Sequence, residues 1–347
     1  GTPVARRCTR AAMRRLVLGL VLTAGCSDSE LGVVVDGERL AGVDMHLHPG
    51  EWDSIPPETQ AFLASRFPFP VNLRPDKAAE VLSPEGILEQ MDRAGVSVGV
   101  LFAIHAPRTV GVFTNDALIA DVASNPQRFY GLANPRVDRW NDEQDAELQR
   151  LREALLAPGI VGIKLAHAHQ QFRLDDPRYF GIYALAQELK KPVYLHTGTS
   201  PFPGTAQEPA ATDPSYLEPA IAAYPGAIFI LGHLGYDFKE QQLGRLEACI
   251  DLATRYPNVY LEPSALGSRA ADPTSQNLRA AYTRMREADL VDRIIYGSDG
   301  PQSPGFVAEY LERSLAAMKA AGYTVDDMRA VLAGNFARVF AVPEPTL

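Results

Sequence analysis

The chain has 347 residues, of which 46% are hydrophobic and 22% are charged, and its formal net charge at pH 7 is −9. This length and composition fit one α/β barrel of about 250 residues with extensions, and they exclude a chain that is disordered throughout. Acidic chains bind polyanions poorly, so we expect no nucleic acid among its partners.

The N-terminus has the pattern of a bacterial export signal. Five arginines lie between positions 6 and 15, and they precede the apolar run 16–22 and the small residues 23–25. Because the apolar run is too short to span a bilayer, we predict a signal peptide at residues 1–25, with Met13 as the natural start. A short buried helix is the alternative.

Cys26 follows this run in a context that resembles the lipobox of bacterial lipoproteins, where the cysteine is acylated. Such an anchor implies an extracytoplasmic chain that contacts a membrane only through lipid, and Ser27 favours the outer membrane of a Gram-negative cell. An ordinary cleaved signal is the alternative. Besides Cys26 the mature chain keeps only Cys249, so we expect no disulfide.

Apolar segments of β type alternate with helical patterns after a tether and entry strand at residues 26–41. The expected strands are Val43–Leu47, Val96–Ile104, Phe129–Ala133, Gly159–Leu165, Val193–His196, Ile228–Leu231, Val259–Leu261 and Ile294–Tyr296. The expected helices are Pro84–Ala94, Asp116–Ser124, Asp142–Leu156, Tyr179–Lys190, Glu240–Tyr256, Gln276–Ala288, Phe306–Ala321 and Asp326–Phe340.

Eight such alternations favour a parallel sheet closed into a (β/α)₈ TIM barrel, as a single α/β domain over residues 42–342. An open, doubly wound sheet is the alternative. It would need a glycine-rich phosphate loop after the first strand, and the sequence there is Asp-Met-His-Leu-His-Pro.

Two proline-containing segments interrupt the alternation, residues 51–83 after the first strand and residues 200–215 after the fifth. Loops that follow the strands of a barrel form the rim of its active site, so we expect both segments to shape substrate access. Their aromatic side chains either line an apolar wall or pack within the loops. These are Trp52, Phe67, Phe69 and Phe202.

Histidines gather at the carboxyl ends of the predicted strands, where barrel active sites form. They are His46, His48, His105, His167, His169, His196 and His233. Residues two apart in a strand project to the same side, so His46 and His48 can share one metal ion in the barrel mouth. Asp299 ends the eighth strand, beside the first in a closed barrel, and can reach the same ion; alternatively, it caps the helix that follows.

Five motifs occur in order along the chain: Asp44-x-His-x-His48, Gly162-Ile-Lys-Leu165, Val193-Tyr-Leu-His196, Gly232-His-Leu-Gly235 and Tyr296-Gly-Ser-Asp299. Together they resemble the amidohydrolase superfamily. The similarity is greatest to the branch with aminocarboxymuconate-semialdehyde decarboxylase and related lactone hydrolases, and it extends over residues 42–340.

This resemblance implies one divalent ion, usually zinc, bound by His46, His48, His196 and Asp299. It also implies that Asp299 takes a proton from a metal-activated water. His233 would polarise the substrate carbonyl or transfer a proton to the leaving group, unless loop carbonyls satisfy its ring nitrogens.

Lys164 leaves the number of ions open. In two-metal members of the family a lysine on the fourth strand is carboxylated and bridges the ions, and His196 and His233 would then bind the second ion. The alternative is a buried lysine paired with a carboxylate, and we favour the single ion. Family members often have a histidine directly after Lys-Leu, but Ala166 stands there, so we expect His167 only as a rim residue that contacts substrate.

Arginines on the predicted rim are candidates for binding an acidic substrate, because a guanidinium pairs with a carboxylate through two hydrogen bonds. Taken singly, each is more often a solvated surface charge. The candidates are Arg74, Arg108, Arg136, Arg173 and Arg269.

The expected function is metal-dependent hydrolysis of a small, carboxylate-bearing lactone, ester or amide. Non-oxidative decarboxylation is the first alternative, and a lipoprotein that binds a metal without catalysis is the second. The expected partner is a small-molecule substrate, and a homodimer stays open.

Overall fold

The computed structural model describes residues 31–66 and 75–347. The predicted signal peptide and Cys26 lie outside the described residues, as do Phe67, Phe69 and Arg74. Within the described ranges, every helix is too short or too polar to cross a membrane.

Seven parallel strands form one sheet in the order β11-β10-β9-β8-β7-β4-β3, so strands that follow one another along this sheet lie side by side. They are β3 (Val43–Leu47), β4 (Val98–Phe102), β7 (Phe129–Ala133), β8 (Ile160–Leu165), β9 (Val193–His196), β10 (Phe229–Gly232) and β11 (Val259–Glu262). Nearly all of their residues are buried, as expected of a parallel sheet covered by helices.

Two antiparallel pairs stand apart from this sheet: β1 (Val33–Val35) with β2 (Glu38–Leu40), and β5 (Ile104–Ala106) with β6 (Gly111–Phe113). The single strand predicted over Val96–Ile104 is therefore two elements. β4 belongs to the barrel, and β5 turns out of it into a hairpin on the rim.

Residues 294–300 close the barrel in place of a regular eighth strand. Ile294 pairs with Leu261 of β11, and Gly300 pairs with Leu47 of β3, both in parallel. Asp299 in between has a φ of 65°, in the left-handed region, so the segment cannot pair as a continuous strand. The TIM-barrel-like fold is confirmed, and its eighth strand is this irregular closing segment.

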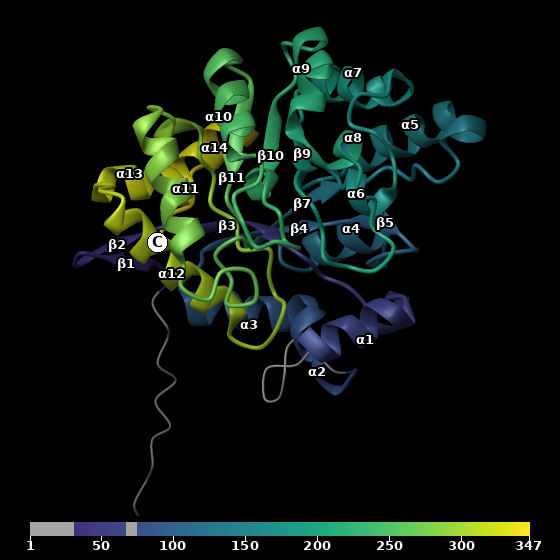
Figure 1. Cartoon of the computed structure of the whole chain (residues 1–347). Helices are drawn as coiled ribbons and strands as arrows, with labels where there is room; N and C mark the ends of the chain where they lie inside the picture. Colours follow the sequence, from purple (N-terminus) through teal and green to yellow (C-terminus); the bar gives the residue numbers. More distant parts are fainter. Residues whose placement is uncertain (1–30, 67–74) are drawn as a thin grey trace, which may run out of the picture.

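Helices surround the barrel, and α1 and α2 lie together beneath it in the view of Figure 1. The helices are α1 (Pro57–Arg66), α2 (Pro75–Leu82), α3 (Pro84–Ala94), α4 (Asn115–Ser124), α5 (Trp140–Leu156), α6 (His167–Gln170), α7 (Phe180–Leu189), α8 (Pro209–Thr212), α9 (Glu218–Ala223), α10 (Leu246–Arg255), α11 (Gln276–Glu287), α12 (Phe306–Ala320), α13 (Val325–Arg329) and α14 (Asn335–Phe340). The helix predicted over Glu240–Tyr256 begins only at Leu246, because the chain turns back on itself between Asp237 and Gln242.

Apolar side chains of α14 fill one end of the barrel interior. Phe336 and Phe340 belong to the same buried cluster as Val43, Met45 and Phe102, which face inward from the strands. The opposite end is left for polar side chains. This end carries α1, which follows β3.

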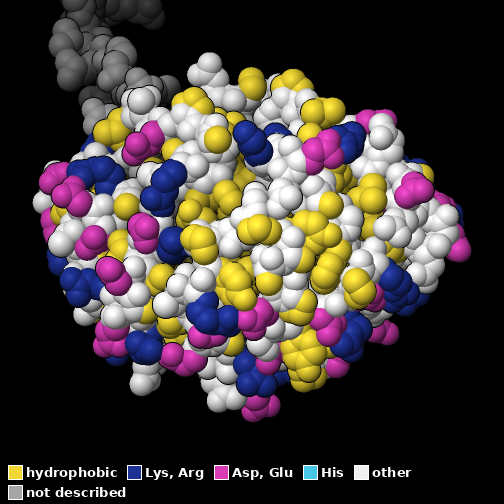
Figure 2. All heavy atoms as spheres, turned by 90° about the horizontal axis from the view of Figure 1, so that it is seen from above, with side chains coloured by type: hydrophobic (Ala, Val, Ile, Leu, Met, Phe, Trp, Pro, Cys, Tyr) yellow, Lys and Arg dark blue, Asp and Glu magenta, His cyan; other side chains and the backbone are white. Residues whose placement is uncertain are grey.

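Hydrophobic side chains gather in the middle of the face shown in Figure 2, while Lys, Arg, Asp and Glu side chains are mixed towards its edge. No histidine is visible on that face. This agrees with the burial of the described histidines, each of which is buried or half-buried.

Asp44 joins β3 to the closing segment. Its carboxylate accepts hydrogen bonds from the amide of Ser298 at 2.9 Å, from the hydroxyl of Ser298 at 2.5 Å and from the amide of His46 at 3.1 Å. The side chain is fully buried, and this burial raises the pKa of Asp44 to about 6.

We expect Asp44→Ala to lower the free energy of unfolding by about 3 kcal/mol, because both donors of Ser298 lose their buried acceptor. Asp44→Asn keeps an acceptor oxygen and should lose less. Urea unfolding followed by circular dichroism measures both. An Asp44→Ala variant as stable as the wild type would show that the contact between β3 and the closing segment does not depend on this carboxylate.

Candidate metal centre and substrate pocket

Three side chains converge where β3 meets the closing segment. The Nε2 atoms of His46 and His48 lie 3.0 Å apart, and Oδ1 of Asp299 lies 3.0 Å from each of them. Ligand atoms of a tetrahedral zinc ion are about 3.3 Å from one another. The three atoms are therefore spaced as ligands of one divalent ion would be.

The electrostatics of this cluster favour a positive charge between its members. Burial acts to raise the pKa of Asp299, but the rings of His46 and His48 outweigh it and hold the pKa well below its ordinary value. Burial also lowers the pKa of His48 to about 4, so its ring is neutral at pH 7 and keeps a lone pair for a metal. An ionised carboxylate and a neutral imidazole are suitable ligands for a divalent ion.

The second ring nitrogen of His46 belongs to a buried hydrogen-bond network. Nδ1 lies 2.9 Å from the hydroxyl of Ser264, 3.0 Å from that of Tyr194 and 3.3 Å from Oε1 of Glu262. Both hydroxyls donate to Oε2 of Glu262, at 2.8 Å and 3.1 Å. Their protons are thus directed to the carboxylate, so Nδ1 of His46 carries a hydrogen and Nε2 is the atom left for a metal ion. Burial acts to lower the pKa of His46, but the carboxylates of Asp299 and Glu262 outweigh it and raise that pKa, so an ion would replace a proton at this place.

Glu262 was not among the site residues predicted from the sequence. The predicted strand ended at Leu261, one residue before it, although a carboxylate directly after an apolar strand could have identified it. Its oxygen also lies close to the ligand atoms of His46 and His233, but on the Nδ1 side of His46, where the hydroxyls of Ser264 and Tyr194 already bond.

The closing segment approaches this network closely because residue 297 is glycine. A Cβ atom at Gly297 would lie 2.1 Å from Oε1 of Glu262 and 2.8 Å from Cβ of His46. No side chain fits in that space, so the Tyr-Gly-Ser-Asp sequence is needed to bring Asp299 to His46.

His233 follows β10 in a 3₁₀ turn, with a left-handed φ of 60°. Its Nδ1 lies 3.2 Å from the carbonyl oxygen of Ser264, which can only accept, so this nitrogen carries a hydrogen. Burial lowers the pKa of His233 to about 4, which keeps the ring neutral at pH 7. The Nε2 atom of His233 therefore starts as a proton acceptor.

His196 ends β9 beside His233, with 4.5 Å between the ring centroids. It lies outside the two groups of converging ligand atoms. Its Nε2 atom is buried and has no hydrogen-bond partner in the described chain. A buried, unpartnered imidazole nitrogen at this place suits an ion or a substrate atom, which would supply the missing partner.

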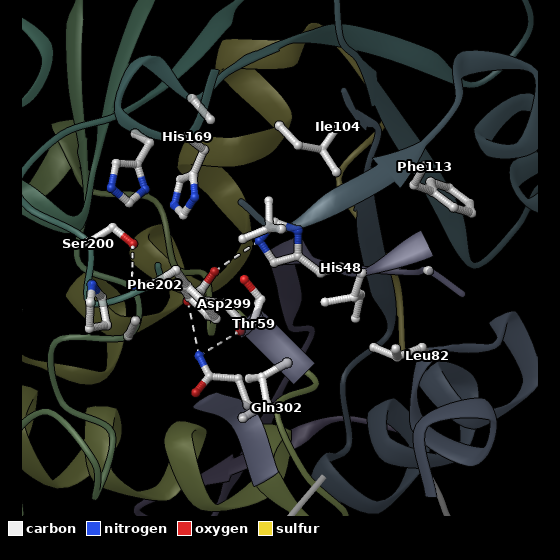
Figure 3. Close-up of a pocket in the computed structure, with 18 of the residues that line it drawn as sticks. His48, Thr59, Leu82, Ile104, Phe113, His169, Ser200, Phe202, Asp299 and Gln302 are labelled. Atoms are coloured by element: carbon white, nitrogen blue, oxygen red, sulfur yellow. Dashed lines mark hydrogen bonds and ion pairs between the residues drawn. The ribbon is translucent and has the colours of Figure 1, made fainter. Parts of the chain in front are cut away.

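A cavity of about 210 Å³ opens above these side chains (Figure 3). Its polar floor is formed by His48, Lys164, His169, His196, His233 and Asp299. Its walls are mostly apolar, and they include Ile55, Phe62, Leu63, Leu82, Ile104, Val110, Val112, Phe113, Phe202 and Phe238. The two segments predicted to shape access, residues 51–83 and 200–215, both contribute to these walls.

The four described rim arginines do not reach this cavity. Arg108, Arg136, Arg173 and Arg269 are absent from its lining. Instead, the guanidinium of Arg173 pairs with Asp175 at 2.8 Å on the surface, and those of the other three contact Gln171, Asp138 and Glu309. Polar and charged surface neighbours satisfy these four side chains, so none of the described rim arginines forms the clamp expected from the sequence.

His167 is also placed differently from the expectation. It is fully buried behind the pocket wall, with its ring 4.1 Å from that of Phe172, and it does not line the cavity. The histidine of this turn that lines the cavity is His169, because the short helix α6 rotates the two histidines to different sides.

A family model described as Amidohydrolase matches residues 43–342. Among characterised proteins, the 2-amino-3-carboxymuconate-6-semialdehyde decarboxylase of Dictyostelium discoideum is 30% identical over 84 residues. That match spans 24% of this chain and only 22% of the decarboxylase.

Solved structures with the same fold cover 87% of this chain. A TIM-barrel protein from Bordetella bronchiseptica has a TM-score of 0.65 at 23% identity over 99% of its length. A probable 2-pyrone-4,6-dicarboxylic acid hydrolase from Acinetobacter baumannii was solved with citric acid. Its TM-score is 0.58, with 18% sequence identity over 100% of its length. A dihydroxybenzoic acid decarboxylase from a Polaromonas species was solved with manganese and 2-nitroresorcinol. Its TM-score is 0.58, with 19% sequence identity over 97% of its length.

We expect Glu262→Gln to weaken the binding of zinc or manganese by about 10- to 100-fold, because it removes the negative charge that orients the His46 ring. Titration of the metal-free chain against a competing chelator measures the affinity. Glu147→Gln is the matched control, since Glu147 is an equally buried carboxylate that pairs with Arg150 on α5. Equal affinities for all three chains would show that the network does not support the metal.

Proposed function

Because the chain belongs to the amidohydrolase family, we propose that it is a metal-dependent hydrolase of a small lactone, ester or amide. The observation that carries the proposal is the convergence of His46, His48 and Asp299, of which His48 and Asp299 line a mostly apolar pocket. Metal dependence follows from the family and from this ligand set, whereas the type of bond cleaved is our proposal.

We propose that His46, His48 and Asp299 bind one ion and that the unpartnered nitrogen of His196 completes its ligands. Zinc suits two or three imidazoles with a carboxylate, and manganese is the second candidate because a structural relative was solved with it. A divalent ion there would polarise a substrate carbonyl and make a water molecule more acidic.

Asp299 is the proposed proton acceptor for the attacking water. Its Oδ1 atom faces the histidines, while Oδ2 accepts a hydrogen bond from Nε2 of Gln302 at 3.0 Å. Both oxygens are thus fixed and the carboxylate is ionised. Nε2 of His233 lies 3.5 Å from the hydroxyl of Tyr194, whose hydrogen is donated to Glu262, so this nitrogen can take up the proton and pass it to the leaving group.

Lys164 is proposed to be unmodified, which favours a single ion. Its ammonium lies over two aromatic rings, 4.1 Å from the centroid of Tyr194 and 4.8 Å from that of Phe102. Aromatic faces attract a cation and would repel the carboxylate of a modified lysine.

Non-oxidative decarboxylation is the second candidate function. The named relatives include two decarboxylases, and apolar walls favour the loss of a charged carboxylate as neutral carbon dioxide. The export signal, the lipid anchor and the homodimer stay predictions from the sequence.

We expect the zinc-loaded chain to hydrolyse aryl or alkyl lactones and esters, and a chelator to abolish this activity. Asp299→Asn should lower kcat by about a thousandfold, because the water loses its proton acceptor. Asp175→Asn is the matched control, since this carboxylate lies on the rim and does not line the pocket.

Metal content is measured for each variant, so that loss of the ion is separated from loss of the base. Release of carbon dioxide from matched aromatic acids, with no ester or lactone cleaved, would overturn hydrolysis in favour of decarboxylation.

A further inference from the structure

Apart from the proposed metal ion, one described cationic side chain lines the pocket. Among the described residues that line the cavity, Lys164 is the only lysine or arginine. It lies on β8, at the floor, and its side chain is 3% exposed. Because the proposed ion serves the water and the bond that is cleaved, a carboxylate elsewhere on the ligand is left with a single ammonium.

This ammonium lacks an anionic partner. Its only close neighbours of the kind that stabilise a cation are the rings of Phe102 and Tyr194, and no carboxylate of the described chain lies within 4.0 Å of it. Asp299 and Glu262 act on it from farther away, and burial outweighs them and lowers its pKa to about 7. Burying an ammonium without a counterion costs free energy, because the charge loses its hydration. A ligand carboxylate beside Lys164 would compensate for that loss.

Apart from Lys164, the described side chains that line the cavity include no lysine or arginine, and two of its polar groups are already engaged. The hydroxyl of Thr59 is already donated to the carbonyl of Thr109, and the amide of Gln302 is donated to Asp299. In Figure 3, Leu82, Ile104 and Phe113 lie on one side of His48, while His169 and Ser200 lie on the other. A second carboxylate would rest on hydrocarbon and lose its hydration without compensation.

Aromatic side chains also cross over the cavity from two separate segments. The rings of Phe62 on α1 and Phe202 in the loop after β9 lie 5.3 Å apart, and Phe202 lies 5.8 Å from His169. These contacts place flat apolar surface directly above the polar floor. They fit a ligand whose body is aromatic or aliphatic.

We propose that Lys164 binds the single carboxylate of a substrate whose remaining body is hydrocarbon or aromatic, and that the pocket discriminates against dicarboxylates. This proposal adds a substrate specificity to the proposed hydrolytic function, and it rests on that function for the identification of the cavity as the active site. It replaces the expected cluster of arginines with one ammonium.

The test compares three ligands of the metal-loaded chain by calorimetry: 4-tert-butylbenzoate, its neutral amide 4-tert-butylbenzamide, and terephthalate, which has a second carboxylate in place of the apolar group. We expect 4-tert-butylbenzoate to bind about tenfold or more tightly than either of the others. Equal or tighter binding of terephthalate by the wild type would overturn the proposal.

Variants separate Lys164 from the metal as the carboxylate site. Lys164→Met should weaken 4-tert-butylbenzoate about tenfold and leave the amide unchanged, whereas Lys164→Arg should keep part of the preference. Phe113→Lys places a cation on the apolar wall and should improve terephthalate binding. Arg173→Met, on the surface outside the pocket, should change none of these values.

If Lys164→Met retains the full preference for the carboxylate, the metal binds it and the proposal is wrong. If Lys164→Met does not fold, the proposal is tested by the order of the three affinities in the wild type and by the change in terephthalate binding in Phe113→Lys. Calorimetry requires no turnover, so a chain that shows this order but cleaves no ester or lactone would refute the proposed reaction and keep the carboxylate site.

Discussion

The hydrogen bonds from Ser298 to Asp44 hold together the seam on which the site depends. They fix the last segment of the barrel against its first strand, at the place where regular strand pairing stops. Asp299 follows Ser298 directly, and His46 and His48 follow Asp44. The geometry of the proposed metal ligands is therefore set by the closure of the fold, with Gly297 providing the space for it.

Sequence periodicity predicted the barrel well because its strands are buried on both faces and separated by amphipathic helices. β3, β7 and β9 begin and end where they were predicted. The closing segment was located but expected as a regular strand, since its left-handed residue Asp299 leaves no mark in a pattern of apolar residues. The convergence of His46, His48 and Asp299 also followed from strand order alone.

The network behind the proposed ligands was not predicted. Glu262, Ser264 and Tyr194 contact the ring of His46, and only Glu262, a carboxylate directly after an apolar strand, has a local sequence that could have indicated its role. For the rim arginines the error was the opposite one, because contacts with substrate were predicted that the described residues do not support. Their positions after strands suggested a clamp, but carboxylates and amides on the same rim, such as Asp175 for Arg173, engage them at the surface.

His48 and Asp299 are 251 residues apart in the chain, yet their side-chain atoms lie 3.0 Å from each other. An ion bound between them would act as a cross-link that closes almost the whole described chain into one loop. Closing so long a loop removes much of the conformational entropy of the unfolded chain. The same ion would thus also stabilise the folded chain, and its removal would lower the free energy of unfolding.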